Sequence, residues 1–317
     1  MRPKIVAVIL LLLGFPRFIS AQVTEPEKTL RTHSSDTING WKKGGVFTAT
    51  VAQTSLTNWV AGGQNSLAIN GLFSGFANYK QGKSVWDNSL DIGYGLMKQG
   101  KDEDFIKTDD KIDILSKYGL EAFKNFYYSA LVNFKTQMTP GYNYPDVTNK
   151  ISDLFAPAYL TLALGLDYKP DPYFSAFMAP VTGKFTFVTD PQLSDAGAFG
   201  VNPGETVKSE FGGYIRAIYS RNDFKSEFLK NVSFTTKIDL FSNYLENPQN
   251  IDVSWETLIA MKVNKYISFN FNTHLIYDDN IGVPYDKDNN GTIENGESIR
   301  SLVQFKEIFG VGLSYKF

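Results

Sequence analysis

The chain has 317 residues, of which 20% are charged and 43% hydrophobic, and its formal net charge is -2. This balance of charges gives no basic stripe, so we expect no nucleic-acid partner. The absence of cysteine excludes disulfides, thiol catalysis and cysteine-ligated metals, and it suits an exported protein.

The N-terminus has the features of a targeting segment. Arg2 and Lys4 precede an unbroken apolar run over residues 5–13. A membrane helix needs about 20 apolar residues, and neither this run nor any later segment approaches that length. Residues 1–21 are therefore predicted to be a cleaved secretory signal peptide. Residues 22–40 are polar and rich in Thr and Ser, and we expect them to form a flexible periplasmic extension.

From Trp41 onward, apolar and polar side chains alternate with the period of two that is typical of β-strands. In residues 267–277, Phe269 and Phe271 share one face, whereas Asn270 and Asn272 share the other. Asn is unfavourable in a soluble core but normal in the lumen of a transmembrane barrel. The pattern predicts about twelve strands, an even number as in bacterial single-chain barrels. They lie at about 43–54, 66–80, 86–96, 108–121, 125–138, 159–168, 173–188, 207–221, 232–243, 251–263, 267–277 and 301–317.

The connections between these strands alternate in length. Short connections fall near 81–83, 124, 169–172 and 264–265, with a medium one at 222–230. The long connections fall near 55–65, 98–106, 139–156, 189–206, 244–250 and 278–300. Outer-membrane barrels have short periplasmic turns and long outer loops, so the alternation favours that architecture over a soluble sandwich.

The last strand carries the most specific signal. Counting back from the terminal Phe317, Tyr315, Leu313 and Val311 share an apolar face, although Glu307 interrupts that face higher up. A terminal aromatic after an alternating strand resembles the signal that barrel-assembly machinery uses during outer-membrane biogenesis. Aromatic residues near strand ends are typical of the girdles at membrane interfaces. They are Trp41, Trp86, Tyr128, Tyr168, Tyr173, Trp255 and Tyr315.

Residues 286–297 match the pattern of a calcium loop. Oxygen ligands are predicted from Asp286, Asp288, Asn290, Thr292, Glu294 and Glu297, with Gly291 at the sharp turn. The flanking segments are strands, whereas an EF-hand has helices, and the alternative is a solvated Asp/Asn/Gly loop. We expect structural Ca²⁺ binding, with the weak affinity of extracellular modules, about 0.1–1 mM.

Only two histidines are present, and His33 lies in the extension. Some outer-membrane phospholipases are barrels of this size that use Ser, His and Asn with calcium, which leaves a calcium-dependent lipid enzyme as one hypothesis. Those enzymes act from the lipid face, whereas His274 shares the polar face of its strand. No serine is placed by spacing as its nucleophile, so we expect no enzymatic activity.

Charged side chains of both signs are predicted to face the lumen. They are Asp87, Asp91, Lys111, Asp113, Lys117, Glu121, Lys135, Asp167, Glu210, Arg216, Lys237, Asp239, Glu256 and Lys262. In a narrow barrel such charges pair across the interior and close it, whereas in a wider barrel they line a wet channel. The sequence leaves both alternatives open. Loop 139–156 or loop 189–206 is long enough to fold inward.

The chain from about Trp41 to Phe317 resembles a family of Gram-negative outer-membrane barrels known only as a domain of unknown function. The resemblance rests on WVAGGQNS at 59–66, APVTGKFTFVTD at 179–190, LSDAGAFGV at 193–201, LIYDDN at 275–280 and the last 15 residues, VQFKEIFGVGLSYKF. It implies an outer-membrane location but no activity and no catalytic residues.

The sequence thus predicts one all-β domain, a transmembrane antiparallel β-barrel over residues 41–317, in contact with outer-membrane lipid and with both termini in the periplasm. The leading hypothesis for function is a non-enzymatic, porin-like channel or small-solute transporter with a calcium-stabilised outer loop. The second is a closed structural or scaffold barrel that binds partners through its outer loops.

Overall fold

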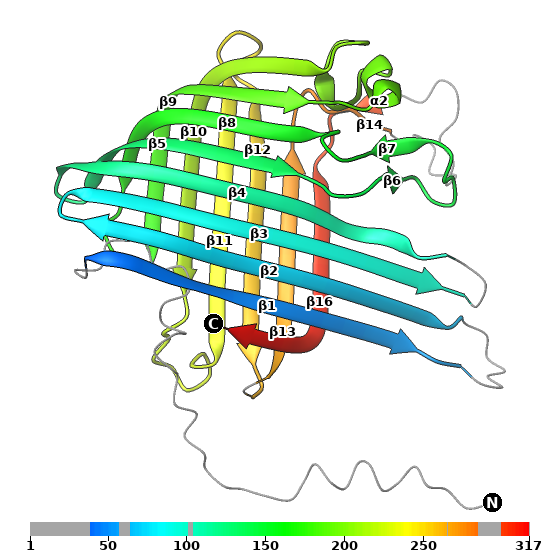
Figure 1. Ribbon diagram of the computed structural model, residues 1–317, viewed down its shortest axis with the longest axis horizontal. Helices are drawn as coiled ribbons and strands as arrows, with labels where there is room; N and C mark the ends of the chain where they lie inside the picture. Colours follow the sequence, from blue (N-terminus) through cyan, green and yellow to red (C-terminus); the bar gives the residue numbers. More distant parts are fainter. Residues whose placement is uncertain (1–38, 57–63, 101–103, 265, 285–298, 317) are drawn as a thin grey trace, which may run out of the picture.

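The computed structural model describes residues 39–56, 64–100, 104–264, 266–284 and 299–316. Twelve antiparallel strands close into one barrel in the order β1-β16-β13-β12-β11-β10-β9-β8-β5-β4-β3-β2 (Figure 1). Their bounds are β1 Gly40–Thr54, β2 Ser66–Gln81, β3 Ser84–Gln99, β4 Ile106–Phe123, β5 Phe126–Thr136, β8 Ala158–Tyr168, β9 Phe174–Phe187, β10 Val207–Arg221, β11 Val232–Asn243, β12 Ile251–Lys262, β13 Ile267–Tyr277 and β16 Gln304–Lys316. The predicted all-β barrel of about twelve strands is confirmed.

The period of two sets which side chains face outward. Leu164, Val181 and Tyr128 are 59%, 65% and 64% exposed, although each is a large apolar or aromatic residue. Polar neighbours on the same strands, such as Asp167 and Ser129, are buried inside the barrel. Apolar groups outside and polar groups inside are the reverse of a soluble barrel and the pattern of a transmembrane one.

The connections at the two ends of the barrel differ in length, as the sequence predicts. Tight connections join β2 to β3, β4 to β5, β8 to β9 and β12 to β13, and a medium connection joins β10 to β11; this is the turn end. The longer connections all lie at the opposite loop end. The predicted signal peptide, almost all of the predicted extension and the predicted calcium loop at 286–297 lie outside the described residues.

Aromatic side chains gather outside the barrel at the turn end. The ring of Trp41 lies 5.1 Å from Tyr79 and 5.7 Å from Trp86. Phe126 stacks on Tyr168 with ring centroids 4.6 Å apart. These rings form the girdle expected at one membrane interface, since amphipathic rings favour the headgroup region.

Three long connections at the loop end carry structure of their own. The β5–β8 connection contains the short pair β6 (Gly141–Tyr142) and β7 (Lys150–Ser152). The β9–β10 connection contains helix α2 (Pro191–Asp195) and the 3-10 turn η2 (Ala198–Gly200). The β13–β16 connection contains β14 (Val283–Pro284) and β15 (Ile299–Arg300). In the described part of the chain no helix is long and apolar enough to cross a membrane.

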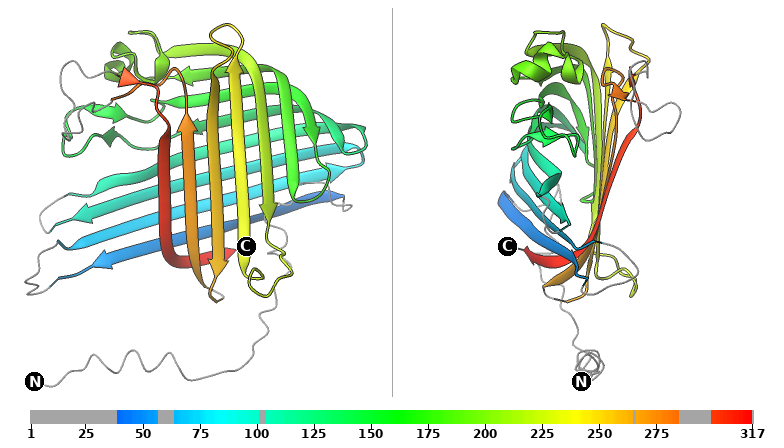
Figure 2. Two further views of the ribbon diagram at one scale, coloured as in Figure 1. Left: turned by 180° about the vertical axis from the view of Figure 1, so that it is seen from behind. Right: turned by 90° about the vertical axis from the view of Figure 1, so that its right-hand side faces the viewer.

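The strands of the two opposing walls cross steeply when the barrel is seen from the side, and β16 bends before it reaches β1 (Figure 2). Gly312 is the first residue of β16 that pairs with β1, and a Cβ atom there would overlap the carbonyl oxygen of Ala49. Only glycine allows the two backbones to approach so closely. The bend brings the C-terminal end of β16 onto β1 and closes the ring.

Candidate functional site

The interior of the barrel is the candidate site, because charged side chains from most strands converge there. Of the predicted lumen charges, seven are buried: Asp87, Asp113, Lys117, Asp167, Glu210, Arg216 and Lys237. Charges this well buried require partners, since an unpaired ion in a low-dielectric interior costs several kcal/mol. The partners come from opposite walls and form three clusters along the barrel axis.

The middle cluster centres on Lys237 of β11. Its Nζ lies 3.1 Å from Glu256 Oε1 on β12 and 3.3 Å from Asp113 Oδ2 on β4. Asp91 on β3 lies 3.7 Å away, and β3 stands on the opposite side of the ring from β11. Glu256 also accepts from Lys111 of β4 at 2.7 Å. These ion pairs therefore cross the lumen and tie its two walls together.

A second set of contacts extends the middle cluster. Arg216 Nη1 lies 3.0 Å from Asp239 Oδ1, and Tyr214 donates its hydroxyl proton to the same carboxylate. Lys135 reaches Asp239 from β5, across the lumen, at 3.4 Å. Asn133 donates to Asp113 at 2.6 Å. Each buried charge thus has more than one polar partner, which is the condition for a stable buried network.

An apolar layer packs beside these ion pairs inside the lumen. Phe177 is completely buried and Leu131 is 1% exposed. They belong to one packed cluster with Leu115, Ala163, Ala179, Tyr214 and Phe241. The ring of Phe177 lies 6.3 Å from that of Tyr214 in an edge-to-face arrangement. The middle of the barrel is thus filled by side chains, and of the two alternatives the structure shows charges that pair across the interior.

The inner cluster lies nearer the turn end. Lys117 Nζ lies 2.6 Å from Asp167 Oδ2, and Lys169 bridges Asp167 and Asp87. Glu121 and Lys262, which were also predicted to face the lumen, are half-buried.

The outer cluster lies near the loop end and centres on Lys184 of β9. Lys184 Nζ lies 2.7 Å from Asp252, 3.1 Å from Asp278 and 3.5 Å from Glu210. The sequence analysis did not place Lys184 in the lumen, because a strict alternation along β9 does not point it there. The ladder is interrupted around Pro180: Ala179 pairs with Tyr214 and Thr182 pairs with Gly212.

This interruption shifts the alternation of β9. Ser175, Phe177 and Ala179 are buried before it, and Thr182 and Thr186 after it. Proline has no N–H to give to a ladder, and within sheets it is found at bulges and edges. Pro180 was therefore the feature of the sequence that could have indicated the shift in the alternation of β9, which points the side chain of Lys184 into the lumen.

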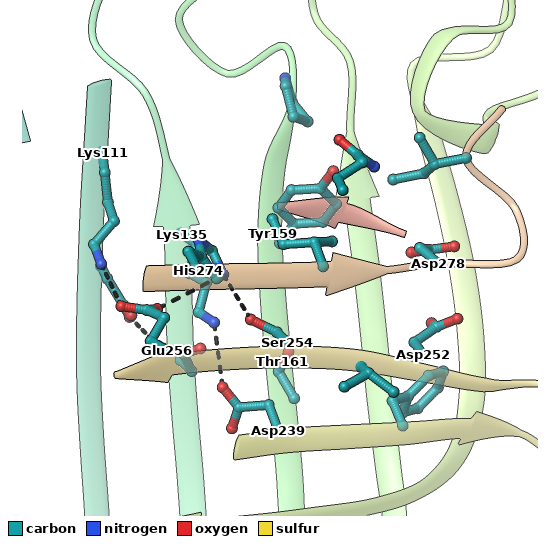
Figure 3. Close-up of a pocket in the computed structure, with 18 of the residues that line it drawn as sticks. Lys111, Lys135, Tyr159, Thr161, Asp239, Asp252, Ser254, Glu256, His274 and Asp278 are labelled. Atoms are coloured by element: carbon teal, nitrogen blue, oxygen red, sulfur yellow. Dashed lines mark hydrogen bonds and ion pairs between the residues drawn. The ribbon is translucent and has the colours of Figure 1, made fainter. Parts of the chain in front are cut away.

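A cavity of about 430 Å³ lies between the middle cluster and the loop end (Figure 3). Tyr159, Lys135 and His274 line it, together with Asp239 and Asp252. Phe199 of η2 and Ser152 of β7 also line it, so both of the long connections that the sequence shows to be long enough to fold inward reach this cavity. Its volume lies in the range of small-molecule sites, about 300–1,000 Å³.

A second cavity, of about 90 Å³, lies on the other side of the middle cluster. Lys237, Arg216 and Leu131 line it, whereas Asp113 and Asp239 line the larger one. The ion pairs Lys237–Asp113 and Arg216–Asp239 therefore stand between the two spaces.

His274 faces the lumen, as its place on the polar face predicted. A hydrogen bond of 3.0 Å joins its Nε2 to Ser254 Oγ, a contact that sequence spacing did not reveal. Glu256 Oε1 approaches the same nitrogen at 4.0 Å. In a catalytic triad the carboxylate holds the other ring nitrogen, so that Nε2 is free to activate the serine. This Ser–His–Glu group is therefore not arranged as a triad.

The long connections form a small core above the cavity. Val188, Leu193 and Val201 pack with Ala156. Beside this core, Lys150 Nζ of the β5–β8 connection lies 2.6 Å from Asp190 Oδ2 of the β9–β10 connection. Hydrogen bonding from Lys150 holds the pKa of the Asp190 carboxyl below its ordinary value, against a smaller opposing effect of burial.

Asp190 has a second role in the same connection, because its Oδ1 accepts from the backbone N–H of Leu193 and caps helix α2. The described residues contain no group of three or more His, Asp or Glu side chains that could hold a metal ion.

Comparison with known proteins gives a family of unknown function. Residues 51–142 match the model of the family described as "Protein of unknown function (DUF3078)". The resemblance seen in the sequence is thus confirmed over this segment. No curated protein matches the chain.

Two solved structures illustrate its similarity to other barrels. The translocator domain of autotransporter NalP from Neisseria meningitidis is 8% identical with a TM-score of 0.38, and the match covers 89% of this chain and 90% of that one. The COG4313 outer membrane channel from Pseudomonas putida F1 is 10% identical with a TM-score of 0.38, over 89% of this chain and 96% of that one. Because both TM-scores lie below 0.5, neither similarity carries an inference about function.

Proposed function

We propose that the protein is a non-enzymatic outer-membrane β-barrel that receives small solutes from outside the cell into the 430 Å³ cavity and passes them inward by opening the middle cluster. The observation that carries this proposal is the position of that cavity. It lies at the loop end, the external side in outer-membrane barrels, and the cross-lumen ion pairs of Lys237 and Asp239 close it below.

The outer-membrane location is part of the proposal. It is supported by the exposed apolar belt, the aromatic girdle at the turn end and the alternation of short turns with long loops. Separation of inner and outer membranes on a density gradient tests it directly. Recovery of the protein from the soluble periplasm would contradict it.

Recording in a planar lipid bilayer tests the closed lumen. We expect the refolded protein to show no steady conductance. The double variant Lys237→Ser/Asp113→Ser removes both members of a cross-lumen pair, so neither charge is left alone, and we expect conductance steps to appear. Lys83→Ser, at an exposed turn, is the matched control and should stay silent. A large constant conductance in the unmodified protein would refute a closed lumen.

Absence of enzymatic activity is supported by the position of the Ser254–His274 pair inside the lumen and by its lack of a triad. Lipid hydrolysis that disappears in His274→Ala would overturn this view. The calcium loop is proposed as a structural site that stiffens the β13–β16 connection, not as a catalytic one.

A scaffold role is the second candidate, and one observation favours it. Val147, Ile151 and Leu154 of the β5–β8 connection are 59%, 53% and 44% exposed at the loop end. These three residues lie within eight positions of one another in the chain, and exposed apolar patches mark contact surfaces. Crosslinking in native membranes separates the two candidates, because a scaffold gives a defined protein adduct at position 151 and a solute transporter gives none.

A further inference from the structure

The two ends of the barrel carry charges of opposite sign. In the described parts of the loop-end connections, nine residues are Asp or Glu and two are Lys or Arg. In the described parts of the turn-end connections, five residues are Lys and three are Asp or Glu. A cleft whose mouth carries one sign of charge concentrates ions of the opposite sign. The loop end therefore attracts cations.

The 430 Å³ cavity at this end has an excess of the same sign. Six carboxylates and four lysines line it. Beside the middle cluster the lining carboxylates have cations close by, for example Lys237 at Asp113 and Arg216 at Asp239. The excess of negative charge therefore lies farther out, in the outer cluster.

Three carboxylates share two lysines in the outer cluster. Lys184 contacts Asp252, Asp278 and Glu210, and Glu210 also lies 3.5 Å from Lys208. Lys184 donates to Asp252 Oδ2 at 2.7 Å, and no hydrogen bond within the described structure reaches Asp252 Oδ1. The cluster thus retains one negative charge, and Asp252 has a carboxylate oxygen that is available to a ligand in the cavity.

The surroundings of Lys184 show how this part of the lumen holds an ammonium group. Its Nζ contacts carboxylates and lies over the ring of Phe241, 5.2 Å from the centroid. Carboxylates and aromatic faces are the partners that ammonium groups favour. Tyr159 lines the same cavity (Figure 3), and its hydroxyl has no hydrogen-bond partner among the described residues. A second ammonium group can therefore find a carboxylate and an aromatic ring while Lys184 keeps its own.

We propose that the cavity binds small organic ammonium compounds, with Asp252 as the counter-ion and Tyr159 as the aromatic partner. The apolar part of such a compound packs against Phe199 and Ile276, which also line the cavity. Its positive charge neutralises the excess charge of the outer cluster. The proposal rests on the proposed function and names the class of solute that the barrel receives.

A single thiol in the cavity reports which charge enters, since the chain has no native cysteine. Thr161 lines the cavity on the same strand as Tyr159 (Figure 3). In the full chain refolded into lipid nanodiscs, Thr161→Cys is treated with a methanethiosulfonate that carries either trimethylammonium or sulfonate. We expect the ratio of the cationic to the anionic rate to exceed that of Ser226→Cys, at an exposed turn, by about tenfold. An equal or smaller ratio overturns the proposal.

Asp252→Asn tests the counter-ion, because it removes the charge and keeps the shape of the side chain. We expect the rate ratio at Thr161→Cys to fall to that of the exposed control. Glu227→Gln removes a charge at the turn end and should leave the ratio unchanged. Asp278→Asn lowers the charge of the same cluster and replaces Asp252→Asn if that variant does not insert into lipid. A ratio that neither variant lowers overturns the proposal.

Competition by choline separates a binding site from a general attraction of cations. Choline chloride should slow the modification of Thr161→Cys by the cationic reagent more than sodium chloride does at the same ionic strength. Tyr159→Leu should remove this protection, because the aromatic face is lost. Equal slowing by the two salts overturns the ammonium site.

The failure of this proposal differs from failure of the proposed function. If neither reagent modifies Thr161→Cys while Ser226→Cys reacts, the cavity does not receive solutes, and the proposed function fails together with the ammonium site. If both reagents modify Thr161→Cys at the ratio of the control, the cavity receives solutes and only the binding of ammonium compounds is wrong.

Discussion

Replacement of Lys237 by methionine is the most direct test of the closed lumen. The side chain is 8% exposed and is the common partner of Asp113 and Glu256, at 3.3 and 3.1 Å, with Asp91 at 3.7 Å. Methionine has most of the side-chain volume of lysine, so the main change is the loss of a positive charge among buried carboxylates. Removing one member of a buried ion pair typically costs about 3–5 kcal/mol.

The structure places this variant at the lower end of that range. Glu256 keeps Lys111 at 2.7 Å, and Asp113 keeps the hydrogen bond from Asn133 at 2.6 Å. We therefore expect a loss of about 3 kcal/mol in the free energy of unfolding. At 1.4 kcal/mol per factor of ten, this is a change of about 150-fold in the unfolding equilibrium.

Urea unfolding in lipid vesicles, followed by tryptophan fluorescence, measures this loss. Lys83→Met, at an exposed turn, is the control and should shift the free energy by less than about 0.5 kcal/mol. Adding Asp113→Asn and Glu256→Gln to Lys237→Met should recover most of the stability, because neutral groups need no buried counter-ion. If the free energy of unfolding of Lys237→Met equals that of the unmodified protein, the middle of the lumen is hydrated. The ion pairs of the middle cluster then do not close the lumen.

Three further predictions follow from other parts of the molecule. Leu164→Arg places a charge in the apolar belt and should destabilise the barrel by about 2–4 kcal/mol, measured by the same unfolding assay; no effect would mean that this face is not in lipid. The depressed pKa of Asp190 means that its contact with Lys150 is intact above the ordinary carboxyl pKa and is lost as the pH falls through the lowered value. Proteolysis of the β9–β10 connection should therefore accelerate only in acid, and Asp190→Asn, which keeps a helix cap, should remove that pH dependence. Calorimetry with millimolar Ca²⁺ should give binding heat that disappears in Asp286→Ala/Glu297→Ala; absence of heat in the unmodified protein removes the calcium site.

Local periodicity determined much of the fold. Alternation along residues 159–168 and 267–277 predicted β8 and β13 with nearly their observed bounds. It also predicted that His274 faces inward. These features depend only on neighbours two residues apart, because successive side chains of a strand point to opposite faces. The alternating connection lengths likewise predicted which end of the barrel carries the loops.

Only the tertiary structure decided how the lumen charges pair. Lys237 meets Asp113 across the barrel, 124 residues away in the chain, and that meeting depends on how strands tilt and stagger around the whole ring. Strand tilt and stagger are linked to barrel size and are not written in any single strand. The inward turn of Lys184 required the interruption of the β9 ladder at Pro180. The sequence by itself thus determined the lumen face of most strands, and the three-dimensional closure of the sheet determined the inward turn of Lys184 and which lumen side chains touch.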